Sequence, residues 1–375
     1  MHIDADFETG SIQILDASNP AAVALSLRDD NASGFRQWFH FRVRDAVGVP
    51  LALRIVNAGQ ASYPGGWSAY SAVASYDGET WFRVPTEYDG GALTIRHTPE
   101  RGEIAYACFA PYPSWRHEAL LQAARASPRA RVIEVGRSVE GRPMSVLAIG
   151  DPERAAHPLW IIAHQHPGET MAAWFMEGVV WRLLDQADPV TRAILDRVVV
   201  YLVPDMNPDG RVRGNHRTNA AGRDLNREWL YPDRHASPEV WSVRGAMEFT
   251  GVDLLLDVHG DESIPYVFAF GAEGIPNYSE RLADLEELFA STLQRIDGDY
   301  QRKEGYALDP PGTADLRLGS LYAAARFGCL SLGLEMPFKD NANRPEGTLG
   351  WSPERSRGFG RSVVETILAC LPTLR

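Results

Sequence analysis

The sequence predicts an α/β protein in two parts: an N-terminal antiparallel β-sandwich and an α/β/α domain with a mixed central sheet. Roughly the first hundred residues hold short runs of β-branched and aromatic residues separated by turn formers, a pattern typical of sandwiches. Later residues alternate between wholly apolar runs and helical patterns, which indicates a sheet buried on both faces. The 375 residues suffice for two or three domains. We expect a sandwich over 1–112 and the α/β/α domain over 113–375.

Within the sandwich, the predicted strands follow one another at short spacing. Pro-Gly-Gly and Asp-Gly turns separate them, and no helical spacing interrupts them. The strands are expected in Gln37–Asp45, in Pro50–Ala58, and in the later segments WFRVP, ALTIRH and IAYACFA. The segment Pro111–Trp115 marks the predicted boundary between the two parts.

Beyond this boundary, five strands and four helices are expected. The strands are LWIIAH (Leu159–His164), RVVVYLVP (Arg197–Pro204), VDLLLDVH (Val252–His259), YVFAFG and CLSLGLEMP (Cys329–Pro337). The helices are HEALLQAARAS, Gly168–Leu184, RLADLEELFASTLQRI and a terminal helix near Arg361–Leu371. This order of elements is typical of a sheet with helices on both sides.

The composition describes an acidic protein without a disulfide framework. A net charge of −12 repels nucleic acid and anionic lipid. The three cysteines, Cys108, Cys329 and Cys370, are distant and show no C-x-x-C spacing. No secretory leader pattern and no apolar run of about 18 residues occurs. We expect a cytoplasmic protein with no nucleic-acid or membrane partner, and the sequence leaves its oligomeric state open.

A possible metal site follows the apolar strand that ends at His164. His166 and Glu169 form an H-x-x-E pair on a Pro-Gly turn, and His259 stands at the end of another predicted strand. Imidazole and carboxylate are proper zinc ligands, and a catalytic site needs three of them with one open position. An H-x-x-E pair also occurs by chance at helix starts, so its spacing alone leaves both interpretations open.

Arginines concentrate in the stretch Val203–Trp229, which holds five of them in an otherwise acidic chain. Such a run is often only a solvated loop. It also suits an enzyme that binds a terminal carboxylate and a developing oxyanion. Glu335 stands in an apolar strand, where it forms either an ion pair or, beside a metal, the general base.

Together, five motifs resemble the carboxypeptidase A-type zinc metallopeptidases, and among them the cytosolic carboxypeptidases. The motifs are HPGE (His166–Glu169), PDMNPDG (Pro204–Gly210), GNHRTNAAGRDLNR (Gly214–Arg227), DVHG (Asp257–Gly260) and LEMPF (Leu334–Phe338). The resemblance covers nearly the whole chain. It implies a hydrolase that removes residues from the C-termini of peptides or proteins, with one zinc ion per chain.

The resemblance also implies a role for each matching residue. His166, Glu169 and His259 would hold the zinc ion, and Glu335 would be the general base and later the proton donor. Arg217 would stabilise the oxyanion, and Asp224 would orient a zinc-bound imidazole. Asn226 and Arg227 would bind the terminal carboxylate of the substrate.

Two further features of the family have no secure position in the sequence. For the tyrosine that covers the substrate, Tyr306 and Tyr322 are both candidates. For the pocket that receives the departing side chain, Arg317 would favour an acidic residue, or it would merely pair with Asp315.

Two alternative functions also fit parts of this pattern. A zinc deacylase of N-acyl amino acids would use a similar H-x-x-E and a distant histidine, although the NPDG and DLNR motifs favour the peptidase. An inactive peptide-binding protein would be expected to lack Glu335, Arg217 or a zinc ligand, and all of these are present. The sandwich could shape substrate access, bind a partner or only stabilise the second part, and stability is the default expectation. Its aromatic segment Tyr63–Tyr76 either borders the cleft or belongs to the sandwich core.

Overall fold

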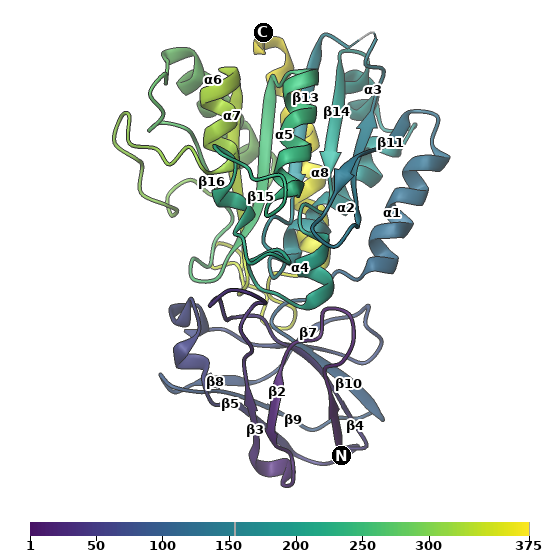
Figure 1. Cartoon of the computed structure of the whole chain (residues 1–375), viewed down its shortest axis with the longest axis vertical. Coiled ribbons are helices and arrows are strands. Elements are labelled where there is room, and N and C mark those ends of the chain that lie inside the picture. The colour runs from purple at the N-terminus through teal and green to yellow at the C-terminus, as the bar shows by residue number, and fades with distance from the viewer. Residues whose placement is uncertain (154, 375) are drawn as a thin grey trace.

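The computed structural model describes residues 1–153 and 155–374, and its two parts lie end to end along the long axis (Figure 1). The first part is a sandwich of two five-stranded sheets. One sheet has the order β1 (His2–Asp4), β4 (His40–Arg44), β10 (Glu103–Ala107), β6 (Val73–Ser75) and β7 (Phe82–Arg83). The other has the order β2 (Gln13–Asp16), β3 (Val23–Ser26), β5 (Leu51–Ile55), β9 (Leu93–His97) and β8 (Thr86–Tyr88).

Alternation of apolar and polar residues builds the sandwich. In β5, Leu51, Leu53 and Ile55 are buried while Arg54 is exposed, so one face of the strand covers the core. The strand pairs are antiparallel except for β3 with β5. These two strands run parallel because the chain passes through β4, in the other sheet, between them. The predicted sandwich is therefore confirmed, with one parallel pair inside it.

The second part is built on a seven-stranded mixed sheet. Its order is β11 (Ala130–Arg137), β12 (Pro143–Ile149), β14 (Val198–Val203), β13 (His157–Ala163), β15 (Leu254–Asp261), β17 (Leu330–Pro337) and β16 (Phe268–Phe270). The central four strands are parallel, and antiparallel strands flank them on both sides. From β13 the chain passes to β14 on one side of it, and from β14 it crosses back to β15 on the other side of β13. In such sheets, ligands bind where the strand order reverses, at the carboxyl ends of the strands.

Helices cover both faces of this sheet (Figure 1). The side chains of Leu159 and Ile161 pack on one side of β13, and those of Trp160 and Ile162 pack on the other. The first face is covered by α1 (Ser114–Ala126), α2 (Thr170–Leu184), α3 (Pro189–Leu195), α6 (Glu280–Ile296) and α8 (Pro353–Cys370). The second face is covered mainly by α5 (Pro238–Thr250) and α7 (Gly319–Phe327).

Several elements depart from the sequence expectation. Strand β11 has no apolar run because it lies at the sheet edge and most of its side chains reach solvent. The short helix α4 (Pro208–Arg213) begins inside the PDMNPDG motif, where no helix is expected from the sequence, and Asn207 caps it. Helix α8 begins at Pro353, about two turns before the predicted start, because Ser352 caps it and Pro353 occupies its first position.

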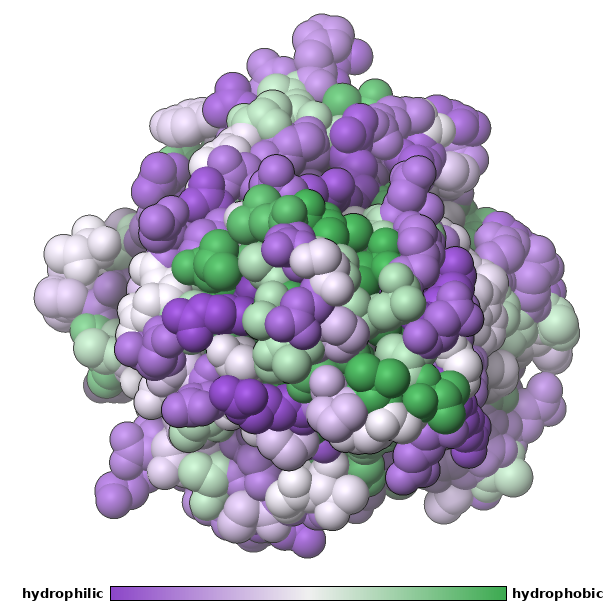
Figure 2. All heavy atoms as spheres, turned by 90° about the horizontal axis from the view of Figure 1, so that it is seen from below, coloured by the Kyte–Doolittle hydropathy of each residue, from purple (hydrophilic) through white to green (hydrophobic). Residues whose placement is uncertain are grey.

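The sandwich has a mixed outer surface. Four of its large apolar side chains are more than two-fifths exposed, namely Ile14, Leu15, Val47 and Val56. Figure 2, seen from the sandwich end, shows apolar side chains near the middle of the face among hydrophilic ones. In the described residues, no helix is both long and apolar enough to span a bilayer.

Candidate active site

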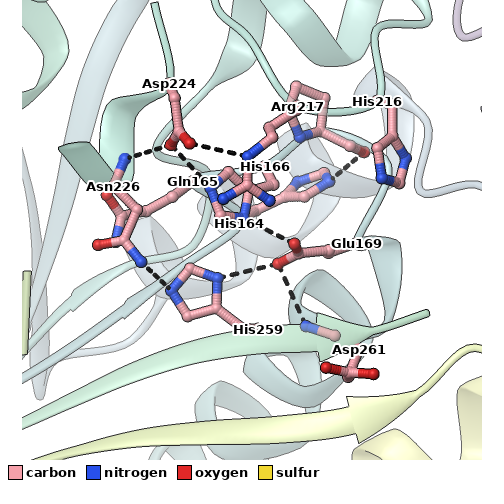
Figure 3. A network of polar contacts seen from close by, with 12 residues as sticks. His164, Gln165, His166, Glu169, His216, Arg217, Asp224, Asn226, His259 and Asp261 are labelled. Carbon is pink, nitrogen blue, oxygen red and sulfur yellow. Dashed lines mark hydrogen bonds and ion pairs between the residues drawn. The ribbon is translucent and has the colours of Figure 1, made fainter. Parts of the chain in front are cut away.

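The three expected metal ligands converge in the structure (Figure 3). His166 and Glu169 lie on the turn between β13 and α2, and His259 lies near the end of β15. One ligand atom from each of the three lies within 4.8 Å of the other two. His166 Nδ1 is 2.6 Å from Glu169 Oε1, and His259 Nδ1 is 2.9 Å from Glu169 Oε2. The three side chains are buried, so a cation bound among them would be sheltered from solvent.

The charges of these side chains are complementary. Burial opposes ionisation of Glu169, but the imidazoles of His166 and His259 outweigh it and hold the pKa of this carboxyl well below its usual range. Burial likewise opposes protonation of His259, yet Asp257 and Glu169 raise its pKa well above the usual value. The site therefore favours an ionised Glu169 carboxylate beside a positively charged His259. A divalent cation would be bound by this carboxylate and by one nitrogen of each imidazole. Two histidines and one carboxylate are a ligand set that fits zinc.

A second carboxylate orients each imidazole from behind. Asp224 Oδ1 lies 2.9 Å from His166 Nε2, and Asp257 Oδ1 lies 3.0 Å from His259 Nε2. Such contacts direct the other ring nitrogen toward a metal. Gln165 in turn donates to both oxygens of Asp257, each at 2.8 Å. The expected position of Asp224 behind a ligand imidazole is present in the structure.

Glu335 faces the ligand set from the neighbouring strand. The register of β15 and β17 places it directly opposite His259. Burial raises the pKa of Glu335 well above its usual range, His259 opposes this effect, and the nearby Glu169 and Asp261 carboxylates add to it. Its Oε1 accepts a hydrogen bond from Tyr306 at 3.1 Å, while Oε2 has no partner among the described residues. One oxygen of a buried carboxylate is thus left available beside the possible metal site.

Arg217 lies next to the metal-site loop on a segment that packs against it. Its Nε donates to Asp224 Oδ2 at 2.7 Å, so one carboxylate joins the arginine to the imidazole of His166. The carbonyl of His216 accepts from the N–H of Gly168 at 2.8 Å. A Cβ on Gly168 would lie 2.4 Å from His216 Nδ1, so only glycine permits this approach.

The comparison with protein families agrees with this geometry. The family described as "Zinc carboxypeptidase" matches residues 117–350, and the one described as "Cytosolic carboxypeptidase N-terminal domain" matches residues 3–109. The chain belongs to the zinc carboxypeptidase family. The family predicted from its motifs is confirmed, and so is the mixed-sheet architecture.

Two similar proteins align with the whole length of this carboxypeptidase, and a third aligns with part of it. An uncharacterized protein of Zymomonas mobilis is 42% identical over 375 residues, which are 100% of this chain and 97% of that protein. A metallo-carboxypeptidase of Pseudomonas aeruginosa, solved in complex with (2-guanidinoethylmercapto)succinic acid, is 46% identical. It aligns with a TM-score of 0.98 over 100% of both chains. Mouse cytosolic carboxypeptidase 4 is 26% identical over 65% of this carboxypeptidase, which covers 26% of that longer protein.

Of the two tyrosines considered for covering the substrate, only Tyr306 reaches the site. Its hydroxyl oxygen lies 2.8 Å from Asp261 Oδ2 and 3.1 Å from Glu335 Oε1, so its single proton lies between the two carboxyl groups. Burial, then the charges of Glu335 and Asp261, raises the pKa of Tyr306 well above its usual range, so it remains a hydrogen-bond donor. Tyr322 lies on α7 and donates to Glu248 at 3.0 Å. We therefore take Tyr306 as the candidate.

The three residues expected to bind substrate differ in how firmly their side chains are held by neighbouring residues. Asn226 is buried, with Nδ2 3.2 Å from His259 Nε2 and Oδ1 accepting from the N–H of Gly319 at 2.8 Å. Arg227 follows it on the same 3₁₀ turn (Leu225–Arg227) and donates to the carbonyl of Asn226. Arg317 forms a two-point ion pair with Asp315, both distances 2.8 Å, and its side chain is 57% exposed.

Sequence reasoning missed further residues of the site. His216 Nε2 lies 2.7 Å from Glu262 Oε1, and the carbonyl of His216 accepts from the N–H of Gly168 in the metal-site turn. Phe35 and Tyr63, both from the sandwich, lie beside the guanidinium of Arg217. His216 stands inside the NHR motif, next to a residue already singled out. Tyr63 belongs to the aromatic segment Tyr63–Tyr76, for which the sequence left open a place at the cleft or in the sandwich core. Phe35 carries no such signal, because more than 150 positions separate it from Arg217.

Proposed function

We propose that this carboxypeptidase removes single residues from the C-termini of peptides or proteins, with one zinc ion held by His166, Glu169 and His259. Metal-dependent hydrolysis at peptide C-termini is the activity of the family. The observation that carries the proposal is the position of Glu335, whose unpartnered oxygen lies in the strand directly opposite the ligand His259. A carboxylate beside such a site is what a metal-assisted hydrolase needs as its base.

Zinc bound here would supply a Lewis acid, which polarises a carbonyl and lowers the pKa of water from 15.7 to about 7. Glu335 would accept the proton of the attacking water on Oε2 and later pass it to the departing amine. The raised pKa of this carboxyl favours its uptake of the proton from water. Tyr306 would hold the other oxygen of Glu335 in place.

Arg217 would stabilise the oxyanion as the peptide carbonyl is attacked. Asp224 fixes its guanidinium through Nε, which leaves the planar end of the group directed away from that contact. We further propose that Arg227, together with Asn226, binds the terminal carboxylate of the substrate. The complex of the Pseudomonas aeruginosa protein with a succinic acid derivative supports carboxylate binding in this fold.

For the departing residue, we propose a preference for aspartate or glutamate. Arg227 and Arg317 both lie near the site, and Asp224 is close enough to Arg317 to raise its pKa after the larger effect of Asp315. An acidic side chain would compete with Asp315 for the guanidinium of Arg317. We also propose a cytosolic location, on the ground of the name of the mouse relative and of the buried free cysteines Cys108 and Cys370.

One experiment tests the activity and the preference together. Matched peptides that differ only in a C-terminal Glu, Lys or Phe are digested, and the released residue is measured by mass spectrometry with and without 1,10-phenanthroline. We expect about one zinc ion per chain by metal analysis, release that the chelator stops, and fastest release of Glu. Chelator-independent cleavage would contradict the zinc mechanism, and faster release of Lys would contradict only the preference.

A further inference from the structure

We propose that the β-sandwich forms part of the active site, and that its residue Asp30 positions Arg217 for catalysis. The inference rests on the role proposed above for Arg217. Asp30 lies in the loop between β3 and β4, and its side chain is buried against the second domain. Among the described residues, Asp30 bonds to the loop 216–218 and to neither the expected metal ligands nor Glu335, so it would act only through the loop that carries Arg217.

The carboxylate of Asp30 accepts hydrogen bonds from three consecutive backbone amides. The N–H of His216 donates to Oδ1 at 2.6 Å, and the N–H groups of Arg217 and Thr218 donate to Oδ2 at 2.7 and 2.8 Å. The hydroxyl of Thr218 adds a longer contact of 3.2 Å to Oδ2. Successive amides directed at one anion form a concave nest. Because this geometry fixes the backbone on both sides of Arg217, it also fixes the direction in which that side chain leaves the chain.

Two glycines show that the whole loop is shaped to meet the sandwich. Gly214 and Gly222 flank the amide cluster, and both have positive φ angles, 68° and 75°. A Cβ on Gly214 would lie 2.6 Å from the carbonyl oxygen of Gly10, and one on Gly222 would lie 2.3 Å from that of Ala32. Any larger residue would separate the loop from the sandwich. The contact therefore depends on the backbone at both ends of the loop.

Side-chain amides close the same interface. Asn31 Nδ2 donates to the carbonyl of Ala220 at 2.6 Å, and Asn215 Nδ2 donates to Asn31 Oδ1 at 2.6 Å. The N–H of Asn31 donates in turn to Asn215 Oδ1 at 3.3 Å. Asp30 and Asn31 are adjacent in the sequence. This one short segment of the sandwich therefore bonds to the middle of the loop, residues 216–218, and to Asn215 and Ala220 on either side of it.

The sandwich also confines the guanidinium of Arg217. Its Cζ lies 5.4 Å from the ring centre of Phe35 and 5.7 Å from that of Tyr63, both within the range of cation–π attraction. Asp224, from the second domain, binds Nε. The arginine is thus held by two rings, one carboxylate and a fixed backbone before any substrate arrives. Donors held in advance at the site of developing charge give the largest electrostatic gain in catalysis.

A purely structural Asp30 would behave differently from a positioning residue. If Asp30 only joined the two domains, its loss would lower thermal stability, and any loss of activity would be the same whether or not Arg217 is present. If Asp30 acts through Arg217, its loss should lower kcat while KM and zinc content stay nearly constant. That loss should also vanish once Arg217 itself has been removed.

The test compares Asp30→Ala and Asp30→Asn with a matched control, Asp29→Asn, which changes the adjacent exposed carboxylate that pairs with Arg36. We expect the Asp30 variants to lose about 10- to 100-fold in kcat, below the 10²–10³ typical of removing an oxyanion donor outright. We expect Asp29→Asn to behave as wild type. In the Arg217→Ala background, Asp30→Ala should cost less than about a further threefold. Amide hydrogen exchange at residues 216–218 should accelerate in the Asp30 variants.

Several results would overturn this inference. Equal losses in the two backgrounds, unchanged kcat, or unchanged amide exchange would each remove the positioning role. If Asp30→Ala does not fold, Asp30→Asn decides the question alone, because its amide nitrogen cannot accept the N–H bonds made to one carboxylate oxygen. A wild-type protein without zinc-dependent release of C-terminal residues would overturn the proposed function itself. An active wild type with additive losses would overturn only the role of Asp30.

Discussion

Glu335 is an acidic and Arg217 a basic side chain, and each is held by a neighbour at one end of its polar group while the other end stays available. Tyr306 holds one oxygen of Glu335, and Asp224 holds Nε of Arg217. A buried carboxylate oxygen without a hydrogen-bond partner destabilises the folded state. Its presence indicates that this site gives up some folding stability for its chemical function. Neither residue is among the three expected metal ligands, so the contribution of each can be removed without removing the metal.

We therefore expect Glu335→Gln to lower kcat by about 10²–10⁴, because the amide cannot accept the proton. Arg217→Ala should lower it by about 10²–10³ through loss of the oxyanion donor. Both variants should retain wild-type zinc content, measured by metal analysis beside steady-state kinetics. Glu286→Gln, at a buried carboxyl that binds Tyr278 instead, is the matched control. Substantial activity in Glu335→Gln would rule out its assignment as the base.

A second prediction at this scale concerns Glu239, at the start of α5. It is fully buried, and its oxygens accept from Asn219 and from the N–H of Val139. Burial raises its pKa to about 7 from 4.5. The folded state therefore binds more protons than the unfolded state between these two pH values. Stability should fall as pH rises through this window, by up to about 3 kcal/mol from this group.

Glu239→Gln should flatten the fall in stability between pH 4.5 and 7.5, as measured by urea unfolding at both ends of the range. Part of the fall should remain, because burial also raises the pKa of Glu286 to about 7. Glu280→Gln changes an exposed glutamate in the first turn of another helix and serves as control. An unchanged pH slope in Glu239→Gln would show that this carboxyl is not the titrating group.

At the level of elements, the turn between β13 and α2 decides whether the metal ligands can converge. Gly168 lets this turn approach His216, with the N–H of Gly168 bonded to its carbonyl. Gly168→Ala would place a methyl group against the imidazole and backbone of His216. We expect zinc affinity to fall about 10- to 100-fold, the range found when groups around metal ligands are disturbed. Gly347→Ala, where a Cβ meets nothing within 4 Å, is the control for competitive zinc titrations.

The elements that the sequence predicted are those whose apolar pattern shows directly which side chains are buried. The apolar runs before His166, His259 and Glu335 indicate buried parallel strands, and the ends of such strands meet at one edge of a sheet. The main residues of the site could therefore be placed from sequence. Helix α5 and the exposed edge strand β11 could not, because neither carries a clear apolar period.

Contacts between distant segments escape this reasoning for a different physical reason. Asp30 and Arg217 are 187 positions apart, and nothing in the local sequence around Asp30 reports on the amides it binds. Tyr306 lies in a loop without periodicity, so its distance from Glu335 could not be inferred from the chain alone. Such contacts depend on how complete elements pack, which a local pattern does not encode.

At the scale of the whole molecule, the sandwich packs against the edge of the sheet at which the parallel strands end (Figure 1). The active site thus lies near the junction of the two parts, a common position for ligand sites. The loop after β17 and the loop after α4 both contact the sandwich. This arrangement predicts that the two parts unfold together, although each has a sheet of its own.

Arg83 of β7 is where this cooperativity can be tested. Its Nη2 donates to the carbonyls of Phe338 and Trp351 at 2.8 and 3.0 Å, and its Nε donates to that of Leu349 at 3.2 Å. Arg83→Met keeps much of the apolar stem and leaves these three carbonyls of the second part without their donor. Unsatisfied buried acceptors cost about 1–3 kcal/mol each, so we expect a loss of about 2–5 kcal/mol for this half-buried group.

Calorimetry should show one transition for the wild type. For Arg83→Met, we expect a lower midpoint and either a broader transition or two separate ones, because the sandwich and the α/β/α part are then less tightly coupled. Arg44→Met removes a half-exposed arginine of the same sandwich that pairs with Glu103 of the same sheet, and should leave the transition unchanged. A single unshifted transition in Arg83→Met would show that the two parts are coupled elsewhere. The loop held by Asp30 would then be the next contact to remove, since it joins the same two parts on the side of the active site.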